Sequence, residues 1–222
     1  MLNVLLRLFI NLTLVGIVVF AAAGRLDWYR GWLFIGLWLF TLAVNFPIVA
    51  LLNPRLVPER FKRRDDIGAT DKRIILLYTL GFIVMLVLAG LDDGRFGWSG
   101  MTMRTAYAGI LLHFMGDFAI VRALVTNPFL ETGVRIQHDR DQHVVTTGPY
   151  RRVRHPMYLG MILMLLGTPL IIGSIWAYVP VAAMILLLVV RTSIEDAMLN
   201  RELPGYTEYA ARTPYRLFPW LW

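Results

Sequence analysis

The stretch MYLGMILMLLGTPLIIGSIWAYVPVAAMILLLVV, residues 157–190, contains no Asp, Glu, Lys, Arg or His. A single helix of this length would run about 50 Å at about 1.5 Å per residue, whereas the hydrocarbon core of a bilayer is about 30 Å thick. The middle of the stretch holds Thr168-Pro169, Gly173-Ser174 and Pro180, which are residue types that break or kink helices. The stretch therefore predicts a tight helical hairpin, about 157–173 and 177–191, with both ends on one side of a membrane.

The rest of the chain is also typical of a membrane protein. Hydrophobic residues make up 57% of the 222 residues and the mean hydropathy is +0.59, which is far above a soluble domain. Further apolar runs lie near 4–23, 31–52, 74–91 and 105–125. The first run lacks a small-residue cleavage pattern followed by a polar mature domain, so we interpret it as a retained helix. The sequence predicts an all-α, polytopic membrane bundle with about six crossings.

The distribution of cations predicts the orientation of this bundle. Eighteen of the 22 Lys and Arg residues fall in segments on one side of the predicted spans, and only Arg25, Arg30, Arg95 and Arg104 fall on the other. The positive-inside rule then places both termini in the cytoplasm and requires an even number of spans. We interpret the net charge of +7 as this bias plus attraction to anionic membrane lipids. No nucleic-acid-binding motif is present.

The sequence lacks the residues and motifs that several kinds of chemistry require. The absence of cysteine excludes disulfides, thiolate metal sites and a cysteine nucleophile. There is no Gly-rich phosphate loop, no HExxH and no GxSxG. The sequence therefore predicts no metal site.

The polar residues gather around one end of the predicted hairpin. The loop 126–155 is long for a connection and contains VRIQHDRDQHVVTTGPYRRVRHP, residues 134–156, in which 144–147 would suit an extended segment. It could wrap a polar ligand, or it could be a solvated segment whose arginines contact lipid phosphates. Arg191, Glu195 and Asp196 follow the hairpin and would face this loop.

The order of these motifs resembles a known family. QHVVTTGPYRRVRHPMYLG (142–160), the apolar hairpin, R-x3-ED (191–196) and LPGYTEYAARTPYRLFP (203–219) are similar to the isoprenylcysteine carboxyl methyltransferases and their phospholipid methyltransferase relatives. These are integral membrane enzymes that use S-adenosylmethionine. The resemblance covers roughly residues 110–220, and the first two or three spans share only their apolar character.

The resemblance implies one membrane methyltransferase domain, 1–222. Its parts are the N-terminal spans 1–103 and a catalytic half 104–222, with the cytoplasmic cofactor loop 126–155, the hairpin 157–191 and the tail 192–222. Arg191 matches the position that engages the substrate. The implied cofactor pocket comprises Gln137, Gln142, His143, Val144, Val145, Tyr150, His155, Pro156, Met157, Tyr158 and Glu195.

This sequence departs from the family pattern in two places. Glu195-Asp196 stands where the families often have Glu-Glu, and Gln142 stands where some members have histidine. Gln137 aligns only with a small gap.

The chemistry of these residues agrees with the implied roles. S-adenosylmethionine has a sulfonium, an ammonium, a carboxylate, a ribose diol and an adenine, so its pocket needs a carboxylate, several donors and an apolar slot. Glu195, His155, Gln142 and Tyr150 or Tyr158 supply that set. Arg191, one helical turn before Glu195, could hold an anionic oxygen near the methyl group. The alternatives are a histidine that contacts headgroups and an arginine that snorkels to the interface.

These observations predict methyl transfer to a lipophilic acceptor that enters from the bilayer, most simply a carboxylate of the prenylcysteine type. A phospholipid N-methyltransferase would share the fold and the cofactor. An NADPH-dependent sterol-type reductase and a non-enzymatic transporter are the alternatives of other classes. A transporter should carry polar residues at the middle of several spans, whereas here they concentrate at one face.

Some remaining residues have structural interpretations. His113 and Asp117 share a face of one span, either as a relay or, more simply, as a hydrogen bond to a neighbouring helix. Ser174 should lie at the outer turn of the hairpin. FKRRDD, residues 61–66, should be a solvated inner loop that contacts lipid phosphates. Interface anchors are predicted at Trp28, Trp32, Trp98, Trp220 and Trp222.

Overall fold

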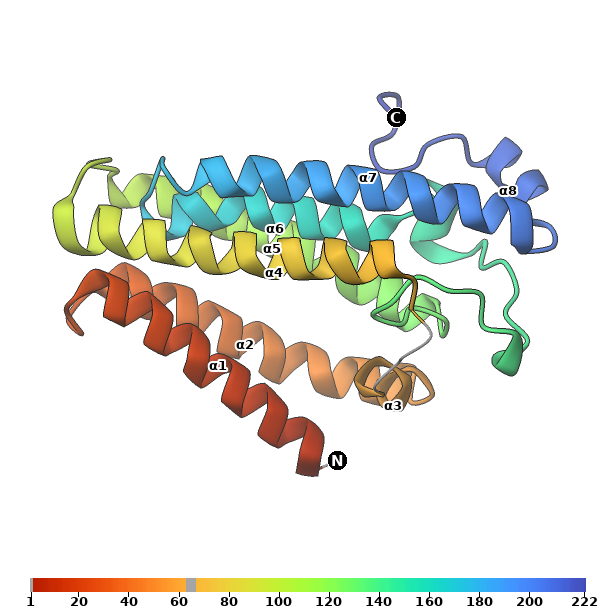
Figure 1. Cartoon of the computed structure of the whole chain (residues 1–222), viewed down its shortest axis with the longest axis horizontal. Helices are drawn as coiled ribbons and strands as arrows, with labels where there is room; N and C mark the ends of the chain where they lie inside the picture. The colour runs from red at the N-terminus through yellow and green to blue at the C-terminus, as the bar shows by residue number, and fades with distance from the viewer. Residues whose placement is uncertain (1, 63–66) are drawn as a thin grey trace. The chain divides into compact units, whose positions relative to one another are not determined.

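The computed structural model describes residues 2–62 and 67–222, and Figure 1 shows its helices in chain order. The chain is 73% helical, and the described residues contain no strand, which confirms the predicted all-α class. The elements are α1 (Leu2–Ala23), α2 (Tyr29–Leu52), α3 (Leu56–Phe61), α4 (Ala69–Ala89), the π-helix η1 (Gly90–Phe96), α5 (Met103–Thr126), the 3-10 helices η2 (His138–Arg140) and η3 (Gly148–Arg151), α6 (Pro156–Ile172), α7 (Tyr178–Glu202) and α8 (Tyr206–Arg212).

The helices have the length and composition of a membrane bundle. Four segments of the described chain are long and apolar enough to cross a membrane, namely Tyr29–Leu52, Ala69–Phe96, Met103–Thr126 and Tyr178–Glu202. Leu8–Ala23 and Pro156–Ile172 are shorter apolar helices at the places of the first and fifth predicted crossings. Many large apolar side chains on these helices are exposed, as lipid-facing residues are. The protein is an integral membrane protein.

The predicted hairpin is confirmed by α6 and α7. The turn begins at Gly173, whose φ of +81° is in the left-handed region that favours glycine. Near the turn, the Tyr178 hydroxyl donates to the Leu166 carbonyl (2.9 Å). At the other end, the Tyr158 hydroxyl donates to Glu195 (2.6 Å), so the two helices run antiparallel. Pro180 lies in the first turn of α7, where its missing N–H has no intrahelical partner to lose.

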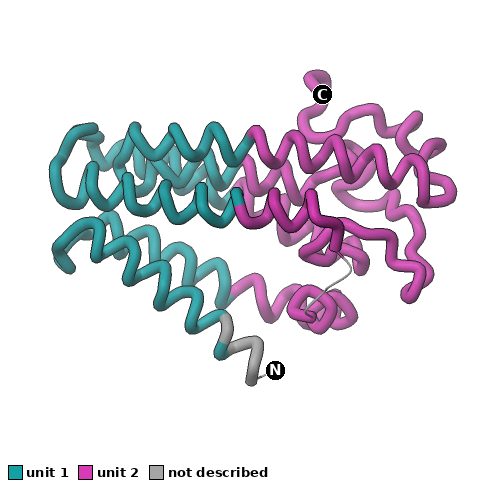
Figure 2. The backbone as a smooth tube through the Cα atoms, viewed as in Figure 1, with its two compact units in different colours: residues 1–43, 77–114, 163–185 teal, residues 44–76, 115–162, 186–222 magenta. Residues whose placement is uncertain are grey.

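The chain forms two compact units (Figure 2). Unit 1 comprises residues 1–43, 77–114 and 163–185, and unit 2 comprises 44–76, 115–162 and 186–222. In unit 1, a Cβ on Gly109 would lie 2.6 Å from the carbonyl oxygen of Gly167, so α5 and α6 approach closely through glycine. In unit 2, a Cβ on Gly160 would lie 2.5 Å from the carbonyl oxygen of Gly116. The last glycine of the GPYRRVRHPMYLG motif is therefore a packing residue.

A buried polar cluster in unit 1 corrects the expected position of Ser174. Ser174 is fully buried, and its hydroxyl donates to Asp92 (2.6 Å). Arg30, counted among the outer cations, is also buried, and it donates to the Ile171 carbonyl at the end of α6 (3.2 Å). Ser174 therefore lies in the turn but not on its surface, because carboxylates and helix-end carbonyls need these donors.

Of the tryptophans predicted to be interface anchors, some are exposed and one is buried. Trp32, Trp98 and Trp220 are exposed, as interface anchors should be. Trp28 is buried, and its indole N–H donates to Asp93 (2.6 Å), so its assignment as an anchor is wrong. Of the predicted FKRRDD loop, residues 63–66 lie outside the described residues.

His113 and Asp117 have different surroundings. In unit 2, Asp117 accepts a hydrogen bond from the Asn45 amide of α2 (2.6 Å), which is the structural role that the sequence favours. In unit 1, the buried His113 ring packs edge-on against Phe114 (5.9 Å), and neither ring nitrogen has a hydrogen-bond partner in the described part of the chain.

The exposed turn provides a test of the proposed cytoplasmic termini. Ile175 is 57% exposed, so a cysteine at this position of the cysteine-free chain should react from outside intact cells with a membrane-impermeant thiol reagent. Ser174→Cys is the matched control, because its burial should prevent labelling in the folded protein. Labelling of Ile175→Cys only after the cells are opened would reverse the proposed orientation.

Candidate active site

One cavity in unit 2 is lined by every site residue that the sequence predicts. Its walls come from the loop after α5, the start of α6, the last turns of α7 and α8. The twelve predicted residues among its lining are Gln137, Gln142, His143, Val144, Val145, Tyr150, His155, Pro156, Met157, Tyr158, Arg191 and Glu195. Residues that are up to 58 positions apart in the sequence therefore share one site.

The two predicted glutamines hold the cavity loop together. The backbone N–H of Gln137 donates to the side-chain oxygen of Gln142 (2.7 Å). The buried Gln137 amide donates to the Phe129 carbonyl (2.6 Å) and accepts from Arg140 (2.6 Å). Gln137 thus shapes the loop with its polar atoms. Residues 142–146 have no regular secondary structure, so the extended segment pairs with no strand among the described residues.

An acidic residue that the sequence analysis missed also lines the cavity. The Glu131 side chain is 1% exposed and accepts two hydrogen bonds from Arg135, both at 3.0 Å. Arg135 also donates to Asp139 (2.8 Å). These hydrogen bonds, first to Glu131 and then to Asp139, raise the pKa of Arg135. The i, i+4 spacing of 131, 135 and 139 could have suggested a helical face, but this segment is mostly irregular.

Tyr150 and His143 contribute aromatic surface to the same cavity. The Tyr150 hydroxyl accepts from the Asn127 amide (3.2 Å), and burial raises the pKa of Tyr150, so the phenol keeps its proton. The His143 ring packs edge-on against Phe129 at 5.0 Å. The cavity therefore has aromatic walls on the side of the loop.

Glu195 and Arg191 both contact the side chain of Tyr158. The Tyr158 hydroxyl donates to Glu195 at 2.6 Å, and the Arg191 guanidinium carbon is 5.7 Å from the centre of the same ring. Because the two α7 residues are one turn apart, they present a cation and an anion on one face of the helix.

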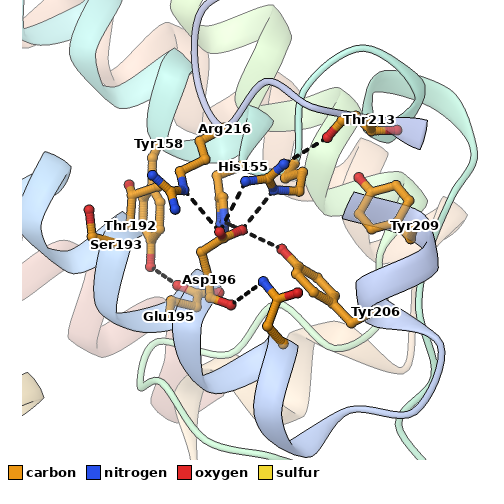
Figure 3. A network of polar contacts seen from close by, with 12 residues as sticks. His155, Tyr158, Thr192, Ser193, Glu195, Asp196, Tyr206, Tyr209, Thr213 and Arg216 are labelled. Atoms are coloured by element: carbon orange, nitrogen blue, oxygen red, sulfur yellow. Dashed lines mark hydrogen bonds and ion pairs between the residues drawn. The ribbon is translucent and has the colours of Figure 1, made fainter. Parts of the chain in front are cut away.

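Asp196 faces away from Glu195 and anchors a separate polar network (Figure 3). The Asp196 side chain is 2% exposed, and its two oxygens accept from Arg154 at 2.8 and 3.0 Å. Arg216 and Tyr206 each donate to it at 2.9 Å. Consecutive helix residues point about 100° apart, so the Glu195-Asp196 pair serves two different environments.

This network fixes the C-terminal tail against the start of α6. Arg154 also donates to the carbonyls of Thr213 (2.8 Å) and Pro214 (2.9 Å). Burial raises the pKa of Tyr206, and the charge of Asp196 raises it further, so this hydroxyl stays a donor. No role for Asp196 could be predicted from the sequence, because its partners Arg154 and Arg216 come from distant parts of the chain.

His155 belongs to both environments. Its Nε2 lies 3.2 Å from Asp196, and its ring stacks on Tyr158 with the centroids 5.9 Å apart. Its backbone N–H donates to the Arg216 carbonyl (2.9 Å). The structure thus places one edge of the imidazole against Asp196 while the residue lines the cavity.

Arg191 already has a carboxylate partner, Asp71, which the sequence analysis missed. Its Nε lies 2.9 Å from one Asp71 oxygen, in an ion pair whose geometry is not that of a hydrogen bond. Its Nη2 donates to the other Asp71 oxygen (3.1 Å) and to the Thr132 carbonyl (2.7 Å). The Arg191 side chain is 11% exposed, so it does not snorkel away from the protein.

Comparison with known proteins gives one family match and two relatives. Residues 102–204 match the model of a family described as phospholipid methyltransferase. The cobalt-zinc-cadmium resistance protein CzcN of Cupriavidus metallidurans is 32% identical over 135 residues, or 60% of this chain and 58% of that protein. The nickel-cobalt-cadmium resistance protein NccN of Alcaligenes xylosoxydans xylosoxydans is 30% identical over 139 residues, or 60% and 59%. The matches thus span less than two thirds of either relative.

Proposed function

We propose that this chain, whose residues 102–204 belong to the phospholipid methyltransferase family, transfers a methyl group from S-adenosylmethionine to a lipophilic acceptor. The observation that carries the proposal is the single cavity lined by all twelve residues that the family resemblance implies. Such a convergence would not be expected if the motif residues were only lipid contacts spread along an interface.

The residues of the cavity fit this cofactor. A carboxylate, Glu195, suits its cationic groups, and Gln142 and His143 provide polar groups for its ribose and carboxylate. The cavity also has apolar and aromatic walls from Val144, Val145 and Phe129, which suit a flat base such as adenine.

The chemistry needs positioning more than proton transfer. S-adenosylmethionine, held by Glu195, Gln142 and His143, would supply an electrophilic methyl group, and its sulfur would retain the electron pair of the C–S bond. A carboxylate acceptor is already ionised at neutral pH, so no base of the protein is needed. Glu195, held by the Tyr158 hydroxyl, offsets the positive charge. Arg191 orients the acceptor oxygen, and the buried walls exclude water.

A second surface pocket offers a place for the acceptor. It is lined by the start of α4 and by the face of α7 from Arg191 to Glu202. It shares Val134, Arg191 and Met198 with the cofactor cavity, and Ile74 and Ile194 give it apolar walls. We propose that the apolar acceptor reaches Arg191 through this pocket from the bilayer. Both pockets would face the cytoplasm, where the cofactor is available.

One observation favours an amine acceptor as a second candidate. Arg191 is paired with Asp71 and has Glu195 one turn away, so two carboxylates lie near the proposed acceptor position. Carboxylates attract an amine and repel a carboxylate. An amine must attack in its neutral form and lose a proton after methylation, so this candidate needs a proton acceptor. Analysis of the methylated product distinguishes an ester from an N-methyl group.

Glu195→Gln tests the cofactor assignment. We expect it to weaken the binding of S-adenosylhomocysteine by about ten- to a hundredfold, or about 1.5–3 kcal/mol, because a charged hydrogen-bond acceptor is lost. Calorimetric titration measures the affinity, and Glu202→Gln at the exposed end of α7 is the matched control. An unchanged affinity in Glu195→Gln would remove Glu195 from the cofactor site.

A further inference from the structure

The ion pair between Asp71 and Arg191 connects the two pockets. Asp71 is in the first turn of α4, is 8% exposed and lines the second pocket, whereas Arg191 lines both pockets. A carboxylate is expensive to bury unless it is paired and hydrogen-bonded. The buried Asp71 carboxylate therefore depends on its partners, Arg191 and the Val134 N–H, and both of these residues line the proposed site.

Asp71 also holds the cofactor loop. The same oxygen that accepts from Arg191 Nη2 (3.1 Å) accepts from the backbone N–H of Val134 (3.0 Å), a residue that lines both pockets. The loop carbonyl of Thr132 accepts from Arg191 as well (2.7 Å). The Asp71 carboxylate of α4 therefore binds both the cofactor loop, at Val134, and Arg191 of α7.

The N–H donors of Arg191 fall into two groups, those that face Asp71 and Thr132 and those that do not. Its Nε and Nη2 face Asp71 and Thr132, while Nη1 has no hydrogen-bond partner among residues 2–62 and 67–222. A guanidinium that is held along one edge keeps its remaining N–H groups in a fixed direction, which lowers the entropy lost when they bind.

We propose that Asp71 is a positioning residue for methyl transfer, which fixes Arg191 against the cofactor loop and leaves Nη1 for an anionic group of the acceptor. This inference rests on the proposed function and adds to it a residue outside the family motif. Asp71 touches neither cofactor nor acceptor in this account, and it acts through Arg191.

The first experiment needs neither cofactor nor acceptor. Phenylglyoxal modifies accessible arginines, and peptide mass spectrometry measures the rate at each position. We expect Arg191 to react at least tenfold more slowly than Arg201, whose side chain is 71% exposed, in the unaltered protein. Asp71→Asn should raise the rate at Arg191 at least fivefold. The matched control is Asp27→Asn, which removes an exposed charge from unit 1 and should leave that rate unchanged.

The second experiment separates positioning from simple structural support. The carboxylate probe is N-acetyl-S-farnesylcysteine. Asp71→Asn should lower kcat at least tenfold, because Arg191 is no longer held in position. It should not raise KM, because the negative charge of Asp71, which repels the carboxylate of the probe, is also lost. The affinity for S-adenosylhomocysteine should stay within threefold. Asp71→Glu keeps the charge and should restore part of kcat.

Three results would overturn the inference. The first is that Arg191 of the unaltered protein is modified as fast as Arg201. The second is that Arg191 is modified at the same rate in Asp71→Asn as in the unaltered protein. The third is that Asp71→Asn loses cofactor affinity and kcat in parallel. Failure of the unaltered protein to bind S-adenosylhomocysteine would instead refute the proposed function. The modification rates would still decide whether Asp71 holds Arg191.

Discussion

Replacing Asp196 by alanine will lower the free energy of unfolding by about 3–5 kcal/mol. The substitution removes a carboxylate that accepts hydrogen bonds from Arg154, Tyr206 and Arg216. Arg154 is 9% exposed, so its charge would stay in the protein interior without an anion. The segment after α7, residues 203–222, should therefore detach before the preceding helices unfold.

Equilibrium unfolding in detergent micelles measures this loss, and proteolysis of the tail should accelerate in parallel. The neighbouring Glu195→Gln is the matched control, because Glu195 is half-buried and the glutamine can still accept from Tyr158. We expect the control to change the unfolding free energy by less than about 1 kcal/mol. A similar small change in Asp196→Ala would show that the network does not hold the tail.

Arg191→Lys will reduce turnover about a hundredfold, near 2.7 kcal/mol, and will leave the cofactor affinity within about threefold, under 1 kcal/mol. Lysine keeps the charge and can still pair with Asp71, but it lacks the fork that contacts Asp71 and Thr132 while offering Nη1 to an acceptor. Kinetics with the carboxylate probe and calorimetry with S-adenosylhomocysteine measure the two effects.

Arg25→Lys is the matched control, since this arginine lies in unit 1, lines neither pocket, and has a side chain that is 50% exposed. It should keep both turnover and affinity. Equal losses of cofactor binding and turnover in Arg191→Lys would assign Arg191 to the cofactor rather than to the acceptor.

Much of the fold could be predicted because it depends on local composition. The uncharged stretch 157–190 is too long for one crossing and has Gly173 near its middle, and the hairpin follows from these two facts. The cavity residues were also predictable. Most of them lie in one continuous motif, 142–158, and helical periodicity places Arg191 and Glu195 on one face.

The features that could not be predicted are long-range pairs of polar residues. Asp71 meets Arg191 across 120 positions, and Asp92 meets Ser174 across 82. Nothing in the composition around these residues indicates a partner, because burial of a carboxylate is decided by tertiary packing. The helix-breaking residues therefore placed Ser174 in the turn without indicating its burial, and helical spacing placed Arg191 beside Glu195 without indicating its pairing with Asp71.

Calorimetric titration of the purified protein with S-adenosylhomocysteine, and separately with NADPH, tests the central claim most directly. We expect S-adenosylhomocysteine to bind at one site per chain with a Kd on the order of micromolar, near 8 kcal/mol, and NADPH not to bind. Binding of NADPH without binding of S-adenosylhomocysteine would contradict the account and would favour the reductase alternative.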